Sequence, residues 1–432
     1  MDPVVAAAVA DAHRMHWGLV LAAAARLTGD LDEAEECAQD AYTAALTQWA
    51  ADRLPTSPAG WLCTVARRRA MDLLRRRDVH RAKLPLLVEA PLTPGPDHVL
   101  EHGYADGPDE GGDLAGEGSP FMAVPDDRLR LIFTCCHPAL DVNARVALTL
   151  RLLCGLSTAD VARAFLTSEP TMAARLTRAK KKIETARIPY TVPAAEDLPA
   201  RLAAVLDVVH LLFTTGHTAP AGVGLVRRDL SERALDLARM LHRLLPADAG
   251  VAGLLALILL TDARRHTRTD ADGRLVLLPE QNRALWDRSE IAEGLTLARQ
   301  ALRVRPVSRY VLMAAIAATH ASAPRWEATD WAQILALYDH LVTLWPSPIV
   351  ALNRAVAVGH ALGPRAGLDA LEPLTRDPQL SGYHYLPATR AEFLHRLNRD
   401  DEARTAYTEA LHLTDNATEQ AFLRRRLAEL PP

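Results

Sequence analysis

Apolar positions recur along most of the chain at the three-to-four-residue spacing of an α-helix. The clearest case is the segment 169–185, where Met172, Leu176, Ala179 and Ile183 fall at i, i+4, i+7 and i+11 and predict one buried stripe. Stretches rich in β-branched and aromatic residues, which favour strands, are nearly absent. Alanine and leucine, both strong helix formers, are abundant. The pattern therefore predicts an all-α protein.

Glycine and proline divide this helical pattern. The stretches 28–30 and 55–60 break the beginning of the chain into three helices. Longer interruptions predict four segments: a helical domain at 1–85, a Gly/Pro-rich linker at 86–120, a second helical domain at 121–188 and a helical extension at 189–432. A linker of this length is either functional or disordered.

The extension contains a weak internal repeat. Ala391, Ala403, Tyr407 and Ala410 show a small–aromatic–small spacing, and Gly367 lies 36 residues before Ala403. This spacing resembles tetratricopeptide repeats, in which small residues let two antiparallel helices approach closely. A helical bundle without repeats is the alternative.

Composition adds limits on the class of protein. Apolar residues make up 49% of the chain and charged residues 24%, as in an ordinary soluble globular protein. The most apolar run, 251–260, is about half of what a bilayer span needs, and the N-terminus lacks a signal-peptide pattern. We therefore expect a cytoplasmic protein without membrane insertion, whose five cysteines are thiols.

Charge is distributed unevenly along the chain. Residues 61–83 carry eight Lys/Arg and two Asp, and residues 170–187 carry six Lys/Arg and one Glu. Residues 91–120 carry seven acidic residues and no Lys or Arg, and residues 28–40 hold six acidic residues and no base. Two basic stretches separated by an acidic one indicate two surfaces that contact phosphates, although solvated helix faces give the same pattern.

The second basic stretch has the form of a helix-turn-helix. Ser157 and Asp160 form the expected N-terminal cap of a short helix, and 166–168 form the turn. Glu169 and Pro170 then open a long basic helix. A recognition helix of this kind places arginines in the major groove, where they bind guanine, while later lysines contact phosphates. A plain helical hairpin is the alternative.

No catalytic or metal-binding motif stands out. Cys135, Cys136 and His137 lack a second Cys/His pair at zinc-finger spacing, so we expect buried thiols there. The chain contains no Gly-rich phosphate loop, His-Glu-x-x-His or Gly-x-Ser-x-Gly motif. We therefore expect no metal, no cofactor and no enzymatic activity.

Two stretches of the first domain resemble a known family. The sequence LTGDLDEAEECAQDAY at 27–42 and the sequence WLCTVARRRAMDLLRRR at 61–77 resemble successive helices of region 2 of bacterial sigma factors. Both are similar to the extracytoplasmic-function (ECF) branch of the sigma-70 family, and the helix-turn-helix then falls where region 4 belongs. The stretch 127–140 and the repeat-like tail resemble the group with a helical C-terminal extension.

This resemblance implies partners and contact residues. Core RNA polymerase would be bound through its β′ clamp helices by an acidic helix bearing Asp32, Glu33, Glu35, Glu36 and Asp40, and through its β flap by region 4. The −10 element of the promoter would be contacted by Arg67, Arg68, Arg75, Arg76 and Arg77. The −35 element would be contacted by Glu169, Thr171, Arg175, Arg178, Lys180, Lys181 and Lys182.

The resemblance thus implies a sigma factor that directs polymerase to promoters and aids their opening. The acidic linker would mimic RNA in a basic channel or serve as a solvated tether. The extension would inhibit or support activity, and an anti-sigma or other regulatory protein is its candidate partner. A different class, a one-component regulator that binds DNA alone and senses a ligand or peptide through the repeats, is the alternative.

Overall fold

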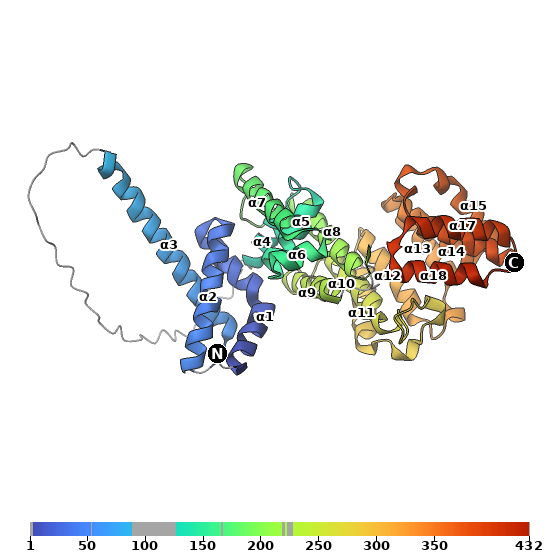
Figure 1. The fold of residues 1–432 in the computed structure, drawn as a ribbon, viewed down its shortest axis with the longest axis horizontal. Coiled ribbons are helices and arrows are strands. Elements are labelled where there is room, and N and C mark those ends of the chain that lie inside the picture. Colours follow the sequence, from blue (N-terminus) through green and yellow to red (C-terminus); the bar gives the residue numbers. More distant parts are fainter. Residues whose placement is uncertain are drawn as a thin grey trace, which may run out of the picture. The chain divides into compact units, whose positions relative to one another are not determined.

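The computed structural model describes residues 3–52, 54–88, 127–165, 167–217, 221–222 and 228–431. These residues form eighteen α-helices and a single parallel pairing of two short strands (Figure 1). The predicted all-α class is confirmed. Most of the predicted acidic linker, 86–120, lies outside the described residues. The last helix of the first domain continues to Val88 and so extends into the start of the predicted linker.

The chain forms two compact units. The first consists of Met1–Cys135, Leu148–Val161 and Glu169–Ala194, and the second of Cys136–Ala147, Ala162–Ser168 and Ala195–Pro432. Two helices, α5 (Val142–Leu148) and α6 (Thr158–Ala164), have residues in both units. The four-segment division therefore stays a prediction.

The first unit is built around a long N-terminal helix. Its main elements are α1 (Pro3–Thr28), α2 (Leu31–Asp52), α3 (Pro58–Val88), α4 (Asp127–Cys135), the π-helical turn η1 (Thr149–Leu153) and α7 (Glu169–Thr185). Helix α1 packs against α2, α3, α4 and η1 (Figure 1). Its alanine-rich second half, 22–25, is buried at the centre of this unit.

The predicted break between α1 and α2 is confirmed in atomic detail. Gly29 adopts a φ of +68°, a conformation that favours glycine. Asp30 then caps α2, because its side-chain oxygen accepts hydrogen bonds from the backbone N–H groups of Asp32 at 2.8 Å and Glu33 at 2.9 Å. Helix α3 begins at Pro58, inside the second predicted break at 55–60.

Small residues let α1 approach η1 closely. A Cβ atom at Gly18 would lie 2.7 Å from the carbonyl oxygen of Leu153, so only glycine fits at this crossing. Gly155, with a φ of +70°, packs just as tightly against the Trp17 ring. The contacts of Gly18 and Gly155 fix the position of the chain at the end of η1. They therefore contribute to the position of α7, which follows.

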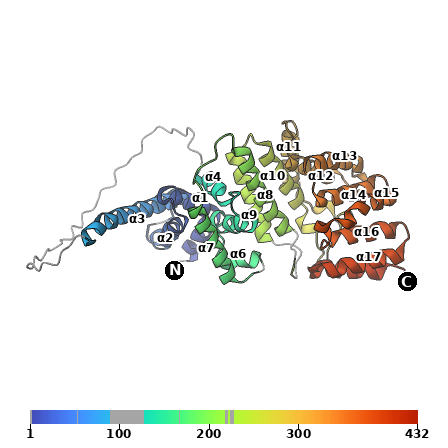
Figure 2. The same cartoon turned by 90° about the horizontal axis from the view of Figure 1, so that it is seen from above.

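The second unit contains the helical extension. Its remaining elements are α8 (Leu198–His217), β1 (Ala221–Gly222), α9 (Arg228–Leu244), α10 (Ala249–Asp262), α11 (Arg288–Ala301), α12 (Arg309–Ser322), α13 (Trp331–Leu344), α14 (Pro348–Ala361), α15 (Pro364–Leu371), α16 (Tyr385–Arg396), α17 (Asp400–Leu413), β2 (Asp415–Asn416) and α18 (Ala417–Glu429). Each helix packs mainly on its neighbours along the chain, as in helical-repeat proteins (Figure 2).

The small residues noted in the sequence are buried where α16 meets α17. Ala391, Ala403 and Ala410 are fully buried, and Tyr407 packs beside them. The helix hairpin expected there is present, but its assignment as a tetratricopeptide repeat stays a prediction.

One stretch of the extension departs from regular helix. Between α10 and α11, residues 263–287 form three short 3-10 turns, η2 (Arg265–Thr267), η3 (Leu278–Glu280) and η4 (Arg283–Leu285). The Trp286 indole N–H donates a hydrogen bond to the Thr267 hydroxyl at 3.0 Å and holds this irregular stretch together.

One helix in the described part of the chain, α8, is long and apolar enough to cross a membrane. The buried core helix of a soluble protein passes the same test. Val205, Val208, Val209 and Leu212 of α8 are buried, and α8 packs on α9 and α10.

Candidate polymerase and DNA interfaces

The predicted recognition helix forms as the apolar pattern requires. Helix α7 spans Glu169–Thr185, and its buried residues are Met172, Leu176, Ala179 and Ile183. The predicted stripe is confirmed residue by residue. Since these four side chains anchor one face, the opposite face of α7 is available for polar contacts.

The helix before the turn begins with the predicted cap. The Ser157 hydroxyl donates a hydrogen bond to the Asp160 carboxylate at 2.7 Å and accepts one from the Asp160 backbone N–H at 3.1 Å. This reciprocal pair fixes the start of α6.

Most of the predicted −35 contact residues lie on the open face of α7. Glu169, Thr171, Arg178, Lys181 and Lys182 are exposed, and Arg175 is partly exposed. The Arg178 guanidinium donates to the carbonyl oxygen of Ala174, one turn earlier, at 3.2 Å. The exposed residues of α7 therefore place several cations on the face opposite the buried stripe.

Lys180 differs from its neighbours because it is already paired. Its ammonium group donates hydrogen bonds to Asp32, at 2.5 Å, and to Glu35. Only 14% of the side chain is exposed. Burial alone would lower the pKa of Lys180, but Glu35 and Asp32 outweigh it, and the pKa is raised.

Glu35 is the centre of this cluster. It is buried, and its second carboxylate oxygen lies 2.8 Å from the guanidinium of Arg151 in η1. One carboxylate of α2 is thus held by cations from η1 and α7, and all three elements belong to the first unit. We call Asp32, Glu35, Arg151 and Lys180 the Glu35 cluster.

Sequence reasoning placed Glu35 and Lys180 on separate interfaces and missed their contact. A signal was present, however. Leu31, Ala34, Ala38 and Ala41 form the buried face of α2, and Glu35 falls between them at helical spacing. A carboxylate on an apolar helix face needs a cationic partner.

The other predicted polymerase-contact carboxylates on α2 lie nearer the surface, although Asp32 also pairs with Lys180. Asp32, Glu36 and Asp40 are exposed, and Glu33 is half-buried. Glu33 lies 3.4 Å from Arg77 and Asp40 lies 3.8 Å from Arg69, both on α3. These surface pairs are weak and can exchange for other partners.

Helix α3 presents the predicted −10 contact residues to solvent. Its buried side includes Leu62, Ala66 and Ala70. Its exposed side carries Arg67, Arg68, Arg75, Arg76 and Arg77. Together with the exposed Arg69, these arginines form a basic surface suited to nucleic acid.

The Cys135–Cys136–His137 stretch has no metal-site geometry. Both thiols are buried and unoxidised. Within the described ranges, no three His, Cys, Asp or Glu side chains are grouped so as to hold a metal ion.

Comparison with known proteins identifies the domains that carry the two basic helices. A family model described as Sigma-70 region 2 matches residues 13–79, and one described as Sigma-70, region 4 matches residues 130–183. A third, a family of unknown function (DUF6596), matches residues 201–302. An uncharacterized protein of Rhizobium meliloti (strain 1021) is 43% identical over 403 residues, which cover 93% of this chain and 90% of the relative.

Helices α1–α3 and the helix-turn-helix therefore define a transcription initiation factor. The chain belongs to the ECF branch of the sigma-70 family, in the group with a C-terminal extension. It directs core RNA polymerase to promoters. The alternative of a one-component regulator is not favoured, because the chain contains region 2 as well as region 4.

Replacing Lys180 by Met should loosen the first unit. The change leaves the buried Glu35 carboxylate with Arg151 alone and should cost about 1–3 kcal/mol of local stability. Hydrogen exchange of α2 peptides, measured by mass spectrometry, reports this loss as faster exchange. The exposed neighbour provides the control, because Lys181→Met should change local stability by less than about 0.5 kcal/mol. Equal exchange in the two variants would contradict the structural role of the Glu35 cluster.

Proposed function

We propose that this sigma factor reads the −35 element with α7 and the −10 element with α3, and binds the polymerase β′ clamp helices with α2. The observation that carries the proposal is the division of α7 into a buried apolar stripe and an exposed basic face. Region 4 would also contact the β flap. The protein would act in the cytoplasm as a non-catalytic subunit, without a cofactor or membrane insertion.

Within α7, the position of each cation suggests its role. Arg175 and Arg178 precede the three lysines and lie nearer to the turn, from which side chains reach base edges. Lys181 and Lys182 lie in the last turns and would contact phosphates, with Lys180 joining them once released from Glu35.

Substituting Arg178 by Ala should relax promoter choice. Loss of a base contact should cost about 1–3 kcal/mol at one −35 position and leave other positions unaffected. Lys181→Ala should instead weaken binding evenly across sequences. Run-off transcription from a set of single-base −35 variants measures both effects. If Arg178→Ala keeps the wild-type ranking of all these variants, α7 does not read the −35 element as proposed.

The acidic face of α2 supports the proposed polymerase contact. Glu36 and Asp40 are exposed and lie one turn apart, whereas Glu35 points into the protein. The exposed pair is therefore the part of the acidic set that a basic partner can reach without unfolding α2.

Reversing the charge of Glu36 and Asp40 to Lys should weaken the complex with core polymerase. Like charges would then face the clamp helices, and juxtaposed like charges cost several kcal/mol at an interface. Dissociation constants from fluorescence anisotropy should rise at least tenfold. Asp401→Lys with Glu409→Lys, two exposed acids of α17, is the matched control and should bind as wild type does. Unchanged affinity of the α2 variant would rule out this face.

The Glu35 cluster adds a constraint on the order of binding. Lys180 cannot pair with Asp32 and Glu35 and also lie against a DNA phosphate. We infer that the arrangement described here is that of the free protein, and that polymerase binding to α2 competes with Lys180 and releases α7 for DNA.

For the extension we propose a supporting role in transcription. Its helices pack continuously on one another from α8 onward, and its charge is nearly balanced, with 27 Lys/Arg and 28 Asp/Glu in 189–432. A DNA mimic that blocks basic helices would need a strong negative charge. A regulatory protein, such as an anti-sigma factor, is a candidate partner for its repeats.

Truncation after Ala194 should abolish transcription. This end point keeps Pro189 and Tyr190, whose backbone and side chain bond to Thr134 and Ala22 within the first unit. Far-UV circular dichroism and thermal unfolding establish whether the shortened chain is folded. Run-off transcription with core polymerase then measures activity. A folded, truncated protein that transcribes more than the full chain would show that the extension inhibits.

A further inference from the structure

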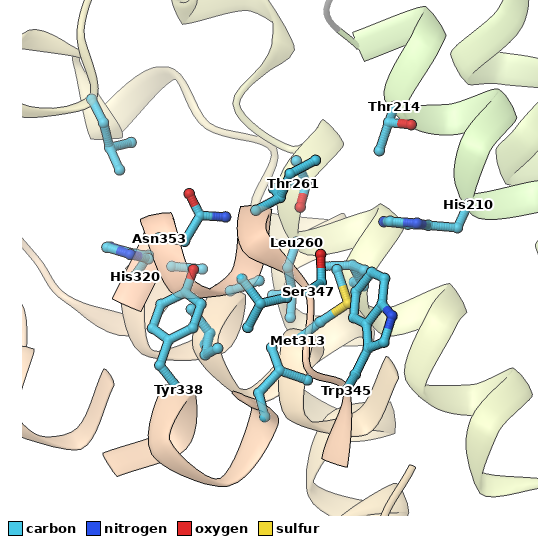
Figure 3. Close-up of a pocket in the computed structure, with 18 of the residues that line it drawn as sticks. His210, Thr214, Leu260, Thr261, Met313, His320, Tyr338, Trp345, Ser347 and Asn353 are labelled. Atoms are coloured by element: carbon cyan, nitrogen blue, oxygen red, sulfur yellow. The ribbon is translucent and has the colours of Figure 1, made fainter. Parts of the chain in front are cut away.

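The extension encloses a cavity of about 590 Å³. Its walls come from α8, α10, α12, α13 and the start of α14, which converge around it in Figure 3. Binding sites for small molecules have volumes of about 300–1,000 Å³. The cavity is therefore large enough for a metabolite-sized ligand.

The lining combines an apolar surface with a few polar groups. Leu260, Met313 and Trp345 contribute apolar surface, and the polar side chains of His210 and His320 reach the cavity from opposite sides (Figure 3). A mainly apolar wall with a small number of placed polar groups is typical of a ligand site.

Arg264, which follows α10, lines this cavity and carries an uncompensated charge. Its guanidinium forms no hydrogen bond or ion pair with any residue that the structure describes. The residue is half-buried and lines the cavity. Burial, and then Arg268 and Arg283, lower the pKa of Arg264 to about 9, so the group is still a cation at neutral pH.

The charged groups that act on Arg264 are two further arginines, Arg268 and Arg283. Arg283 donates to the backbone carbonyls of His320 at 2.7 Å and Ala323 at 2.6 Å, and the carboxylate of Glu327 partly compensates its charge. Nearby Asp262 pairs with Arg265 at 3.1 Å. A half-buried cation without a counter-charge is costly, and an anionic ligand bound beside Arg264 would remove that cost.

His320 is a second unsatisfied group in the same wall. Its Nδ1 atom is buried without a hydrogen-bond partner among the described residues. Burial, and then Arg264 and Arg283, lower the pKa of His320 to about 4, so the ring is neutral at physiological pH. A neutral imidazole beside a cation can orient a polar ligand group without adding charge.

We propose that this cavity binds a small organic anion, with its carboxylate or phosphate group on Arg264 and its apolar body against Leu260, Met313 and Trp345. The extension would then be a ligand-binding module as well as a part of the transcription factor. The proposal rests on the cavity alone and does not depend on how the sigma domains contact promoter or polymerase.

A matched pair of fluorescent probes tests the charge requirement in the full-length protein. The sulfonate 8-anilinonaphthalene-1-sulfonate and the uncharged N-phenyl-1-naphthylamine differ by one anionic group. Wild type should bind the sulfonate, and Arg264→Met should weaken that binding at least tenfold while binding of the neutral probe stays within twofold. Arg365→Met, a change at an exposed arginine of α15, should leave both affinities unchanged.

The same variant has a second signature that separates ligand binding from a structural role. Removing a half-buried cation that has no counter-charge should raise the unfolding temperature of the ligand-free protein by about 2–4 °C. A lower unfolding temperature with unchanged sulfonate binding would show that Arg264 is structural, and would overturn the proposal.

Competition identifies the head group. Decanoate or decyl phosphate should displace the bound sulfonate probe from wild type, and the stronger competitor distinguishes a carboxylate ligand from a phosphate. Equal displacement by 1-decanol would show that the cavity selects apolar chains without regard to charge, and would also overturn the proposal.

Discussion

The packing of the first unit depends on one buried carboxylate, that of Glu35. Glu35 sits on the apolar face of α2, where an unpaired charge would cost several kcal/mol. Its neutralisation requires Arg151 from η1 and Lys180 from α7, so these elements must converge on α2. The close crossing of Gly18 with Leu153 brings η1 into place for this purpose. The same interaction ties a helix of region 2 to the second helix of the helix-turn-helix in region 4, and so links the surfaces proposed to bind polymerase and DNA.

The local features of the fold were readable from the sequence because short-range physics determines them. The four-residue stripe of α7, the Ser157–Asp160 cap and the break at Gly29 all depend on residues within one or two helical turns. The two basic helices were found in the same way, since exposed cations cluster in the sequence as well as in space. The site residues on α3 and α7 follow from those helices together with the family resemblance.

Contacts between residues far apart in the sequence could not be predicted from it. Glu35 and Lys180 are 145 positions apart, and no periodicity reports which carboxylate meets which lysine. The charge of Arg264 gave no signal either, because its lack of a partner is a property of the folded neighbourhood. The irregular stretch 263–287 replaces expected helix, and its hydrogen bonds to Trp286 and Arg283 join residues separated by up to 40 positions.

The central claim is that the two basic surfaces act on promoters through polymerase. It is tested most directly by measuring binding of a promoter duplex, selected from a random library by the reconstituted holoenzyme, with and without core enzyme. Fluorescence anisotropy should show tight, sequence-specific binding only when core polymerase is present, accompanied by run-off transcripts. Tight, specific binding by the protein alone, with no transcripts after core enzyme is added, would contradict the account.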